Sequence, residues 1–381
     1  MNVSTVTPDD LDYALDPACI ATHPAEPRDS ARMLVLHRAA DRVEHRSIRD
    51  IVGYLDAAGA LIVNETRVEA MRFLAARDGD GRTCEGLFVD PTSDGLWRVM
   101  IRGAKHFASG DVLRLTPPTD EIEVRVRLER RDGVHWVVSI CGGLTATAAW
   151  NAAGWTPLPP YILAARQQRG ESLAAAGDTD DADRREYQTV YARGSDLPSC
   201  AAPTAGLHFT TDLLQNIAAQ GVATIRTELQ VGPGTFRPVD APTLETHPMH
   251  SERCRVSAAA MCALAHCDPA ASLVVGTTSV RLLESLSRPL PIDALERARQ
   301  LVASGQGDQP ALAFATDMLI APGFEFRWTN RLLTNFHLPR STLLALVGAL
   351  IGLDRLKRVY ALAQREGYRF YSFGDAMLIL P

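Results

Sequence analysis

A run of short alternating strands in the middle of the chain interrupts a different pattern on either side. Between about 71 and 141, apolar and polar residues alternate in short segments that Asp, Gly and Pro turns separate. This spacing is typical of an all-β unit, because alternate side chains face the same side of a strand. The segments are Leu87–Val89, Trp97–Ile101, Val112–Leu115, Ile122–Leu128 and Trp136–Ile140. We therefore expect a smaller all-β barrel domain inserted at 71–150.

The flanking parts of the chain alternate apolar runs with helix-like segments. We expect strands at Met33–His37, Ala60–Val63, Ala223–Leu229 and Leu273–Val275, and helices at 48–57, 211–220, 280–286, 342–350 and 354–365. The pattern predicts an α/β (α+β) main domain with a mixed sheet or barrel, formed discontinuously by 1–70 and 151–381. A chain of 381 residues is also longer than a single hydrophobic core usually supports, so two domains are expected. The polar segment 167–183 is expected to be a mobile loop or partly disordered.

Composition narrows the class of protein. The net charge is −6, and almost all basic side chains are Arg, with Lys only at Lys105 and Lys357. This balance argues against a general nucleic-acid coat but allows a local basic groove. Seven scattered Cys without a Cys-x-x-Cys pair favour a reducing cytoplasm. No apolar run reaches the roughly 18 residues of a membrane span, so we expect no membrane association, and nothing implies a protein partner.

The stretch from Tyr187 to Val239 carries two loops rich in Gly, Pro and Thr around the helix expected at 211–220. Small residues let a backbone approach a ligand closely, and His208 and Arg237 would line that approach. Such loops are also ordinary connectors. Composition alone leaves both interpretations open.

Polar turns follow two of the expected strands. Asn64–Arg67 follows the first apolar run, and Gly276–Ser279 lies between a strand and a helix. Polar residues at strand ends are where α/β folds place their sites, and a helix N-terminus favours an anion. Either turn could equally be a cap for the next element.

The segment His247–Glu252 places two imidazoles and a carboxylate close together. These groups could transfer protons, orient a substrate or form a structural hydrogen-bonded pair. Zinc would need further ligands, and Pro248 makes a regular helical face doubtful; we predict no metal. The chain also has no P-loop, no Gly-x-Ser-x-Gly elbow and no Gly-x-Gly-x-x-Gly motif.

An ordered set of motifs resembles the S-adenosylmethionine:tRNA ribosyltransferase-isomerase family of queuosine biosynthesis. The motifs follow one another along nearly the full length, and the set is specific although each is weak alone. They are 28–35, 61–68, 157–162, the stretch 187–239, 247–252, 275–285, 333–339, 341–344 and 368–379.

The resemblance implies a reaction. The family transfers the ribosyl part of S-adenosylmethionine to 7-aminomethyl-7-deazaguanine at the wobble position of a tRNA with a GUN anticodon. It also isomerises the ribose, giving epoxyqueuosine-tRNA with release of adenine and methionine. S-adenosylmethionine is then a consumed substrate, so no cofactor is expected.

On this resemblance, His208, His250 and Glu252 are the candidates for proton transfer. The candidates for substrate binding are Asn64, Thr66, Arg67, Thr204, Gly206, Gly232, Gly234, Thr235, Arg237, Thr277, Thr278, Ser279, Arg281, Asn335, His337 and Asp375. Arginines expected to contact tRNA phosphates are Arg184, Arg185, Arg193, Arg237, Arg340 and Arg369.

Three positions depart from the family pattern: the family usually has Asp where this chain has Glu65, His where it has Gln230, and Gly where it has Ala315. The segments 167–183 and 194–200 also look longer than is usual in the family. The alternative hypothesis is a divergent homologue that binds RNA or nucleoside without catalysing the transfer.

Overall fold

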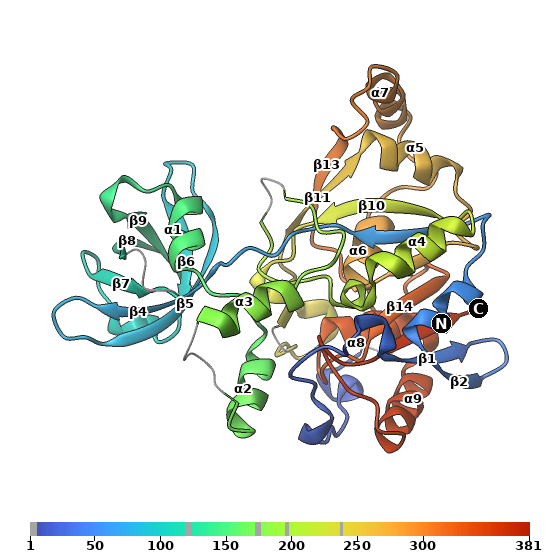
Figure 1. Ribbon diagram of the computed structural model, residues 1–381, viewed down its shortest axis with the longest axis horizontal. Coiled ribbons are helices and arrows are strands. Elements are labelled where there is room, and N and C mark those ends of the chain that lie inside the picture. Colours follow the sequence, from blue (N-terminus) through green and yellow to red (C-terminus); the bar gives the residue numbers. More distant parts are fainter. Residues whose placement is uncertain (1–5, 119–122, 172–176, 195–197, 237–238) are drawn as a thin grey trace. The chain divides into compact units, whose positions relative to one another are not determined.

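A computed structural model describes residues 6–118, 123–171, 177–194, 198–236 and 239–381, with the backbone alone at 146, 177–179, 235 and 236. The chain packs as two compact units (Figure 1). The main unit comprises Met1–Arg67, Thr189–Leu197 and Ala202–Pro381, and the barrel unit comprises Val68–Gln188 and Pro198–Ala201. Residues 151–188, which the sequence analysis assigns to the main domain, lie in the barrel unit.

The main unit is built on a nine-stranded mixed sheet with the order β13-β11-β10-β3-β12-β14-β15-β1-β2. Strands β10, β3, β12 and β14 are parallel neighbours, and β1 is parallel to β15; the other pairs are antiparallel. Their bounds are β1 Arg32–His37, β2 Arg42–Ser47, β3 Ala60–Asn64, β10 Ala223–Leu229, β11 Glu252–Ser257, β12 Leu273–Val275, β13 Pro310–Thr316, β14 Arg331–Asn335 and β15 Ala376–Leu380.

The central strands are buried on both faces. All residues of β3, β12 and β15 are buried, which is why they are continuous apolar runs without the alternation of a half-exposed strand. The register aligns Leu61 of β3 with Thr224 of β10 and with Leu273 of β12. The four predicted strands of the main domain are confirmed within one or two residues.

Helices cover the sheet of the main unit. They are α4 Thr211–Ala219, α5 Ala258–His266, α6 Thr277–Glu284, α7 Ile292–Ala303, α8 Thr342–Ile351 and α9 Leu353–Arg365. Short 3-10 helices lie at η1 Pro8–Leu11, η2 Pro17–Cys19, η3 Arg28–Ser30, η4 Ile48–Tyr54, η7 Thr204–His208, η8 Pro233–Phe236 and η9 Leu244–Thr246. The helix expected at 48–57 is therefore a shorter 3-10 helix. No helix in the described ranges has the length and apolar character needed to cross a bilayer.

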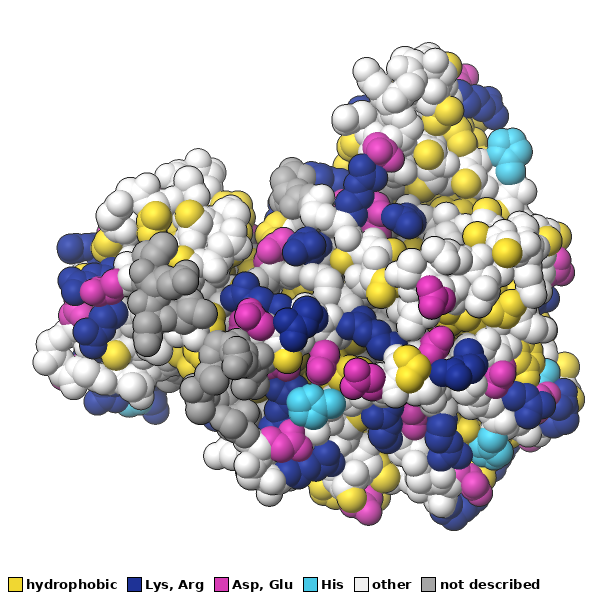
Figure 2. All heavy atoms as spheres, viewed as in Figure 1, with side chains coloured by type: hydrophobic (Ala, Val, Ile, Leu, Met, Phe, Trp, Pro, Cys, Tyr) yellow, Lys and Arg dark blue, Asp and Glu magenta, His cyan; other side chains and the backbone are white. Residues whose placement is uncertain are grey.

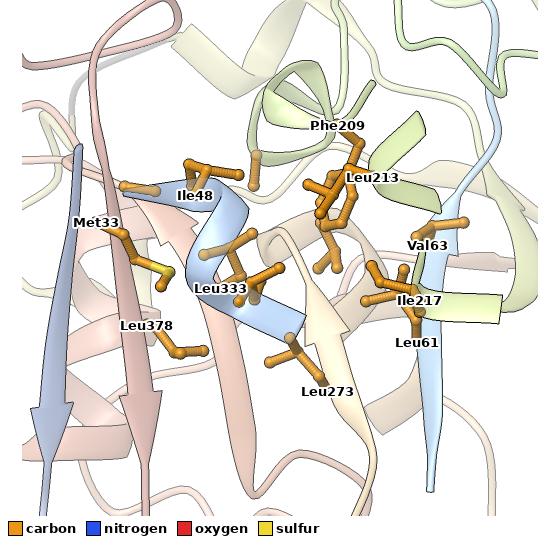
Figure 3. Close-up of a cluster of buried hydrophobic side chains, with 14 of the residues drawn as sticks. Met33, Ile48, Leu61, Val63, Phe209, Leu213, Ile217, Leu273, Leu333 and Leu378 are labelled. Carbon is orange, nitrogen blue, oxygen red and sulfur yellow. The ribbon is translucent and has the colours of Figure 1, made fainter. Parts of the chain in front are cut away.

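One face of the sheet packs against α4 and η4. Figure 3 shows Phe209, Leu213 and Ile217 facing side chains of the sheet strands, with Ile48 of η4 beside them. Thr210 is the N-cap of α4: its hydroxyl accepts a hydrogen bond from the Leu213 N–H at 3.1 Å and so caps the first turn. This core fixes η7, which immediately precedes α4, against the sheet.

The barrel unit contains a closed six-stranded barrel with the order β4-β5-β6-β9-β8-β7. The strands are β4 Arg72–Arg77, β5 Thr83–Pro91, β6 Trp97–Ile101, β7 Val112–Thr116, β8 Val124–Asp132 and β9 His135–Ile140, with η5 Ala104–His106 between β6 and β7 and η6 Cys141–Gly143 after β9. The mixed sheet and the closed barrel together confirm the predicted fold class. Strand β4, which the alternating pattern does not predict, pairs with both β5 and β7 and closes the barrel.

Three α-helices follow the barrel strands: α1 Ala146–Ala153, α2 Pro160–Gln168 and α3 Gly177–Glu186. The expectation of a loop at 167–183 is wrong for the part from Gly177, which is helical. Arg166 forms two hydrogen bonds of 2.8 and 2.7 Å with the Asp183 carboxylate, and both side chains are buried. This bidentate ion pair holds α3 against α2 despite the polar composition of 167–183.

Substitution of Leu213 by Ala tests the packing of α4. Leu213 is 2% exposed and lies in the core cluster, so we expect Leu213→Ala to lower the free energy of unfolding by about 2–5 kcal/mol. Leu214→Ala is the matched control, because Leu214 has the same helix propensity but is only partly buried. Urea unfolding would measure both. Equal losses for the two variants would contradict this packing.

Candidate active site

Four parallel strands of the main sheet end at one edge. The register of β3, β10, β12 and β14 brings their carboxyl ends together, and β15 begins at the same edge because Ala376 pairs with Asn335. Ligands of α/β sheets bind outside this edge. The strands place many predicted site residues along it: Asn64 at the end of β3 and Thr66 after it, Gly232 and Gly234 after β10, Thr277–Ser279 after β12, Asn335 at the end of β14 and His337 after it, and Asp375 before β15.

Glu252 joins three elements at this edge. It is the first residue of β11 and is 5% exposed. Its Oε1 accepts a hydrogen bond from the Gly232 N–H at 3.1 Å, and its Oε2 forms an ion pair with Nη1 of Arg281 in α6. Arg281 also donates from Nε to the Met318 carbonyl at 3.2 Å. Since both carboxylate oxygens are engaged, Glu252 holds the glycine turn and the Arg281 guanidinium in place.

His250 lies against the same glycine turn. A Cβ on Gly234 would stand 1.8 Å from Cδ2 of His250, so the ring occupies this place only because residue 234 has no side chain. His250 is exposed, and no described residue hydrogen-bonds to its imidazole. The structure thus brings His250, Glu252, Gly232, Gly234 and Arg281 together.

The 3-10 helix η7 lies at the ends of β12 and β14. A Cβ on Gly276, directly after β12, would be 3.6 Å from Cβ of Ala205 and 3.8 Å from Oγ1 of Thr278. Gly276 has φ +82°, a conformation that favours glycine. This glycine lets the first turn of α6 approach η7 closely.

His208, the last residue of η7, contacts the end of β14. Its Nε2 lies 3.4 Å from the Asn335 amide nitrogen, which also donates to the Tyr371 carbonyl at 3.0 Å. Burial, with Arg369 and Arg28 nearby, lowers the pKa of His208 to about 3. The ring is therefore neutral near pH 7 and, as a weak base, is poorly suited to remove a proton from carbon.

His337 is likewise buried and neutral. Burial lowers its pKa to about 3. Its Nε2 lies 2.7 Å from the Thr334 hydroxyl, and its backbone N–H donates to the Tyr360 hydroxyl at 3.0 Å. These contacts give His337 a structural role in the turn after β14.

Other predicted residues also hold the edge together. Asn64 donates to the Leu229 carbonyl at 3.0 Å and accepts from the Leu229 and Thr66 N–H groups, both at 3.1 Å. Asp375 accepts from the backbone N–H of Arg32 at 3.0 Å and of Arg369 at 2.8 Å. The Ser279 hydroxyl donates to the Val275 carbonyl at 2.7 Å. These contacts position the turns between strands.

The remaining candidates are placed as follows. Thr66 and Thr277 are buried, Thr204 and Gly206 lie in η7, and Arg67 is exposed beside Gly194. The side chain of Thr235 and the whole of Arg237 lie outside the described residues.

Several buried polar atoms at this edge have no hydrogen-bond partner among the described residues, and five of them lie on or near η7, α6 and β14. These five are Oγ1 of Thr189, Oη of Tyr191, Oγ1 of Thr278, Nη2 of Arg281 and Oδ1 of Asn335. Buried polar groups are nearly always hydrogen-bonded, so each such group needs a cause, and a bound ligand is one. Thr189 and Tyr191 are not among the predicted site residues, although both stand in the motif that opens at Tyr187.

The family model and the similar sequences both point to one protein family. The model of a family described as queuosine biosynthesis protein matches residues 8–379. A protein named S-adenosylmethionine:tRNA ribosyltransferase-isomerase from Moorella thermoacetica is 38% identical, over 98% of this chain and 99% of that protein. One of the same name from Anaeromyxobacter dehalogenans is 40% identical, over 97% and 98%. A crystal structure of S-adenosylmethionine tRNA ribosyltransferase from Thermotoga maritima is 28% identical, over 97% of this chain and 100% of that chain, with TM-score 0.49.

The chain belongs to the queuosine biosynthesis protein family. The resemblance stated from its motifs is confirmed. Two of the departures from the family pattern, Gln230 and Glu65, lie beside the predicted site. Gln230 accepts a hydrogen bond from Nε of Arg253 at 2.9 Å, and burial raises the pKa of Glu65.

Glu65 also borders a polar pocket of about 220 Å³. The pocket is lined by Glu65, Arg193, Gly194, Arg226, Glu228, Arg255, Ser257, Asp308, Gln309 and Pro310. Arg193 pairs with Asp308 at 3.0 Å. Because acids and arginines alternate around it, the pocket does not offer a field of one sign to a phosphate.

The arginines predicted to contact tRNA are mostly in ion pairs. Arg184 pairs with Asp180, Arg340 with Asp9 and Asp12, and Arg369 with Asp375. Figure 2 shows the same mixture, with acidic side chains scattered among the Lys and Arg side chains. A phosphate contact would have to share or replace these carboxylates.

The Glu252–Arg281 pair can be tested by removing one partner and then both. Both side chains are less than a tenth exposed, so Glu252→Gln should lower the free energy of unfolding by about 3–5 kcal/mol, because it leaves a buried guanidinium without a counter-charge. Adding Arg281→Met should restore much of the loss. Urea unfolding of the two variants would decide, and a double variant less stable than the single one would contradict the interpretation.

The buried neutral histidines predict acid sensitivity. Between pH 6.5 and 3 the unfolded chain binds protons at these histidines that the folded chain does not. The contribution of these histidines to the free energy of unfolding is therefore fully present above about pH 6.5 and is lost as the pH falls toward 3. His337→Gln should reduce this slope by at most about 1.4 kcal/mol per pH unit. Urea unfolding at several pH values measures the pH dependence of the free energy of unfolding. The exposed His266→Gln is the control. If the free energy of unfolding of His337→Gln changed with pH as steeply as that of the wild type, His337 would not be a buried neutral group.

Proposed function

We infer that this chain is an enzyme that transfers the ribosyl moiety of S-adenosylmethionine to tRNA and isomerises it. The family model spans residues 8–379, and relatives that carry the name of this activity match along almost the whole chain. The structural observation that supports a ligand site is the set of five unpartnered buried polar atoms at the carboxyl edge of the sheet.

The finer proposal concerns the acceptor and the products. The acceptor is 7-aminomethyl-7-deazaguanine at the wobble position of a tRNA with a GUN anticodon. The products are epoxyqueuosine-tRNA, adenine and methionine. An anticodon loop suits such an enzyme, because its single-stranded bases can be turned out into a pocket.

The reaction needs a base for a C5′ hydrogen that the neighbouring sulfonium makes acidic. His250 fits this role among the three predicted residues, since its imidazole has no partner among the described residues. Glu252 is occupied by Gly232 and Arg281. The neutral His208 can donate or accept a hydrogen bond to the departing adenine but is a weak base.

Substrate binding is proposed for groups with unused hydrogen-bonding capacity. Nη2 of Arg281 can donate to the methionyl carboxylate, while Oγ1 of Thr278 and Oδ1 of Asn335 can bond polar groups of the nucleoside. The proposal includes no cofactor and no metal; within the described residues no group of three His, Cys, Asp or Glu side chains is arranged to hold a metal ion. A cytoplasmic location fits the seven free cysteines.

Incubation with S-adenosylmethionine and tRNA carrying the aminomethyl-deazaguanine tests this function. Mass spectrometry should detect released adenine and epoxyqueuosine. His250→Ala should lower kcat by at least about 100-fold, the usual contribution of a positioned base, while the exposed His266→Ala keeps wild-type turnover. Full activity of His250→Ala would remove His250 from the mechanism. Absence of adenine release by the wild type, with tRNA still bound, would favour the non-catalytic homologue.

A further inference from the structure

Tyr191 places its hydroxyl against the backbone of η7. A Cβ on Gly206 would stand 2.0 Å from Oη of Tyr191 and 3.0 Å from Cγ2 of Thr189. Both side chains therefore need a glycine at 206. The Arg193 N–H donates to the Glu65 carbonyl at 2.8 Å, which places this segment beside the end of β3.

These two hydroxyls are buried and unsatisfied. Thr189 and Tyr191 are each 4% exposed, and neither hydroxyl has a hydrogen-bond partner among the described residues. Burying a hydroxyl without a partner is unfavourable, whereas Phe and Val would fill the same space without that cost. The ring of Tyr191 already packs in the core, 6.5 Å from the ring of Phe209, so packing alone does not account for its Oη.

A third unpartnered hydroxyl lies on the neighbouring segment. Thr278, in the first turn of α6, is 9% exposed and its Oγ1 also lacks a partner among the described residues. It stands beside Gly276, which packs on Ala205, the residue next to Gly206. Three hydroxyls from two segments, Thr189 and Tyr191 of 189–191 and Thr278 of α6, thus border the backbone of η7 at Ala205 and Gly206.

The chemistry of this group indicates an uncharged, hydroxyl-rich ligand. Each hydroxyl can both donate and accept, as the hydroxyls of a sugar do. Burial raises the pKa of Tyr191, so its phenol stays protonated and can donate. Arg281, one turn further along α6 from Thr278, keeps Nη2 without a partner among the described residues and can take the charged end of a substrate.

We propose that the hydroxyls of Tyr191 and Thr189 bind the ribose hydroxyls of the nucleoside substrate, with Thr278 completing the contact. This inference rests on the proposed function, because it takes the sugar to be that of S-adenosylmethionine. It adds two substrate-binding residues to the site.

Tyr191→Phe separates this role from simple packing. Without ligand the variant should unfold at the same or a higher urea concentration than the wild type, because an unpartnered buried hydroxyl is removed. Its dissociation constant for S-adenosylmethionine, measured by calorimetry without tRNA, should rise about 3- to 10-fold, the range for one lost hydrogen bond. Thr189→Val should behave alike.

Tyr54→Phe is the matched control. The Tyr54 hydroxyl donates to Glu44 at 2.9 Å, so its removal should lower stability and leave the dissociation constant unchanged. The two tyrosines should therefore give opposite patterns of stability and binding.

A substrate lacking one hydroxyl makes the test specific. The 2′-deoxy or 3′-deoxy form of S-adenosylmethionine should bind more weakly to the wild type, and Tyr191→Phe should reduce that penalty, because each change removes one side of the same contact. If Tyr191→Phe binds the substrate as tightly as the wild type, the ribose contact is refuted while the proposed function stands. If the wild type neither binds S-adenosylmethionine nor releases adenine, the proposed function and this inference both fail.

Discussion

The parallel pairing of β10, β3, β12 and β14 is the constraint on which the rest of the main unit depends. Strands that are apolar on both faces must be covered on both faces, and parallel neighbours need long crossovers. The long crossover between the parallel strands β3 and β10 contains the whole barrel unit and α4. As a result, turns that are far apart in sequence end at one edge, where polar side chains meet.

At that edge, polar groups are used in two different ways. One set has hydrogen-bond or ion-pair partners that connect neighbouring strand ends: Asn64, Asp375 and the Glu252–Arg281 pair. Hydroxyls near η7 and the Asn335 carbonyl have none within the described residues. The first set fixes the geometry of the turns before any ligand arrives, which lowers the ordering cost of binding. The second set supplies the contacts that a ligand can complete.

Elements with a strong local pattern could be predicted from sequence. The apolar run of β3 and the alternating run of β8 identify their strands directly. Strand β4, Arg72–Arg77, has two Ala and lacks β-branched residues, so its state is decided by pairing with both neighbours in the closed barrel. In α3, the buried ion pair with Arg166 overrides a composition that favours a loop.

The sequence by itself determined the family and the main strands and helices along the chain, and it predicted which polar turns form the site. Tertiary structure decided what each polar residue does there. Burial makes His208 and His337 neutral, the Gly234 turn holds the ring of exposed His250, and Gly206 admits the hydroxyl of Tyr191. Hydrogen-bond partners and solvent exposure depend on segments that meet only in the folded chain, so residue type alone could not assign these roles.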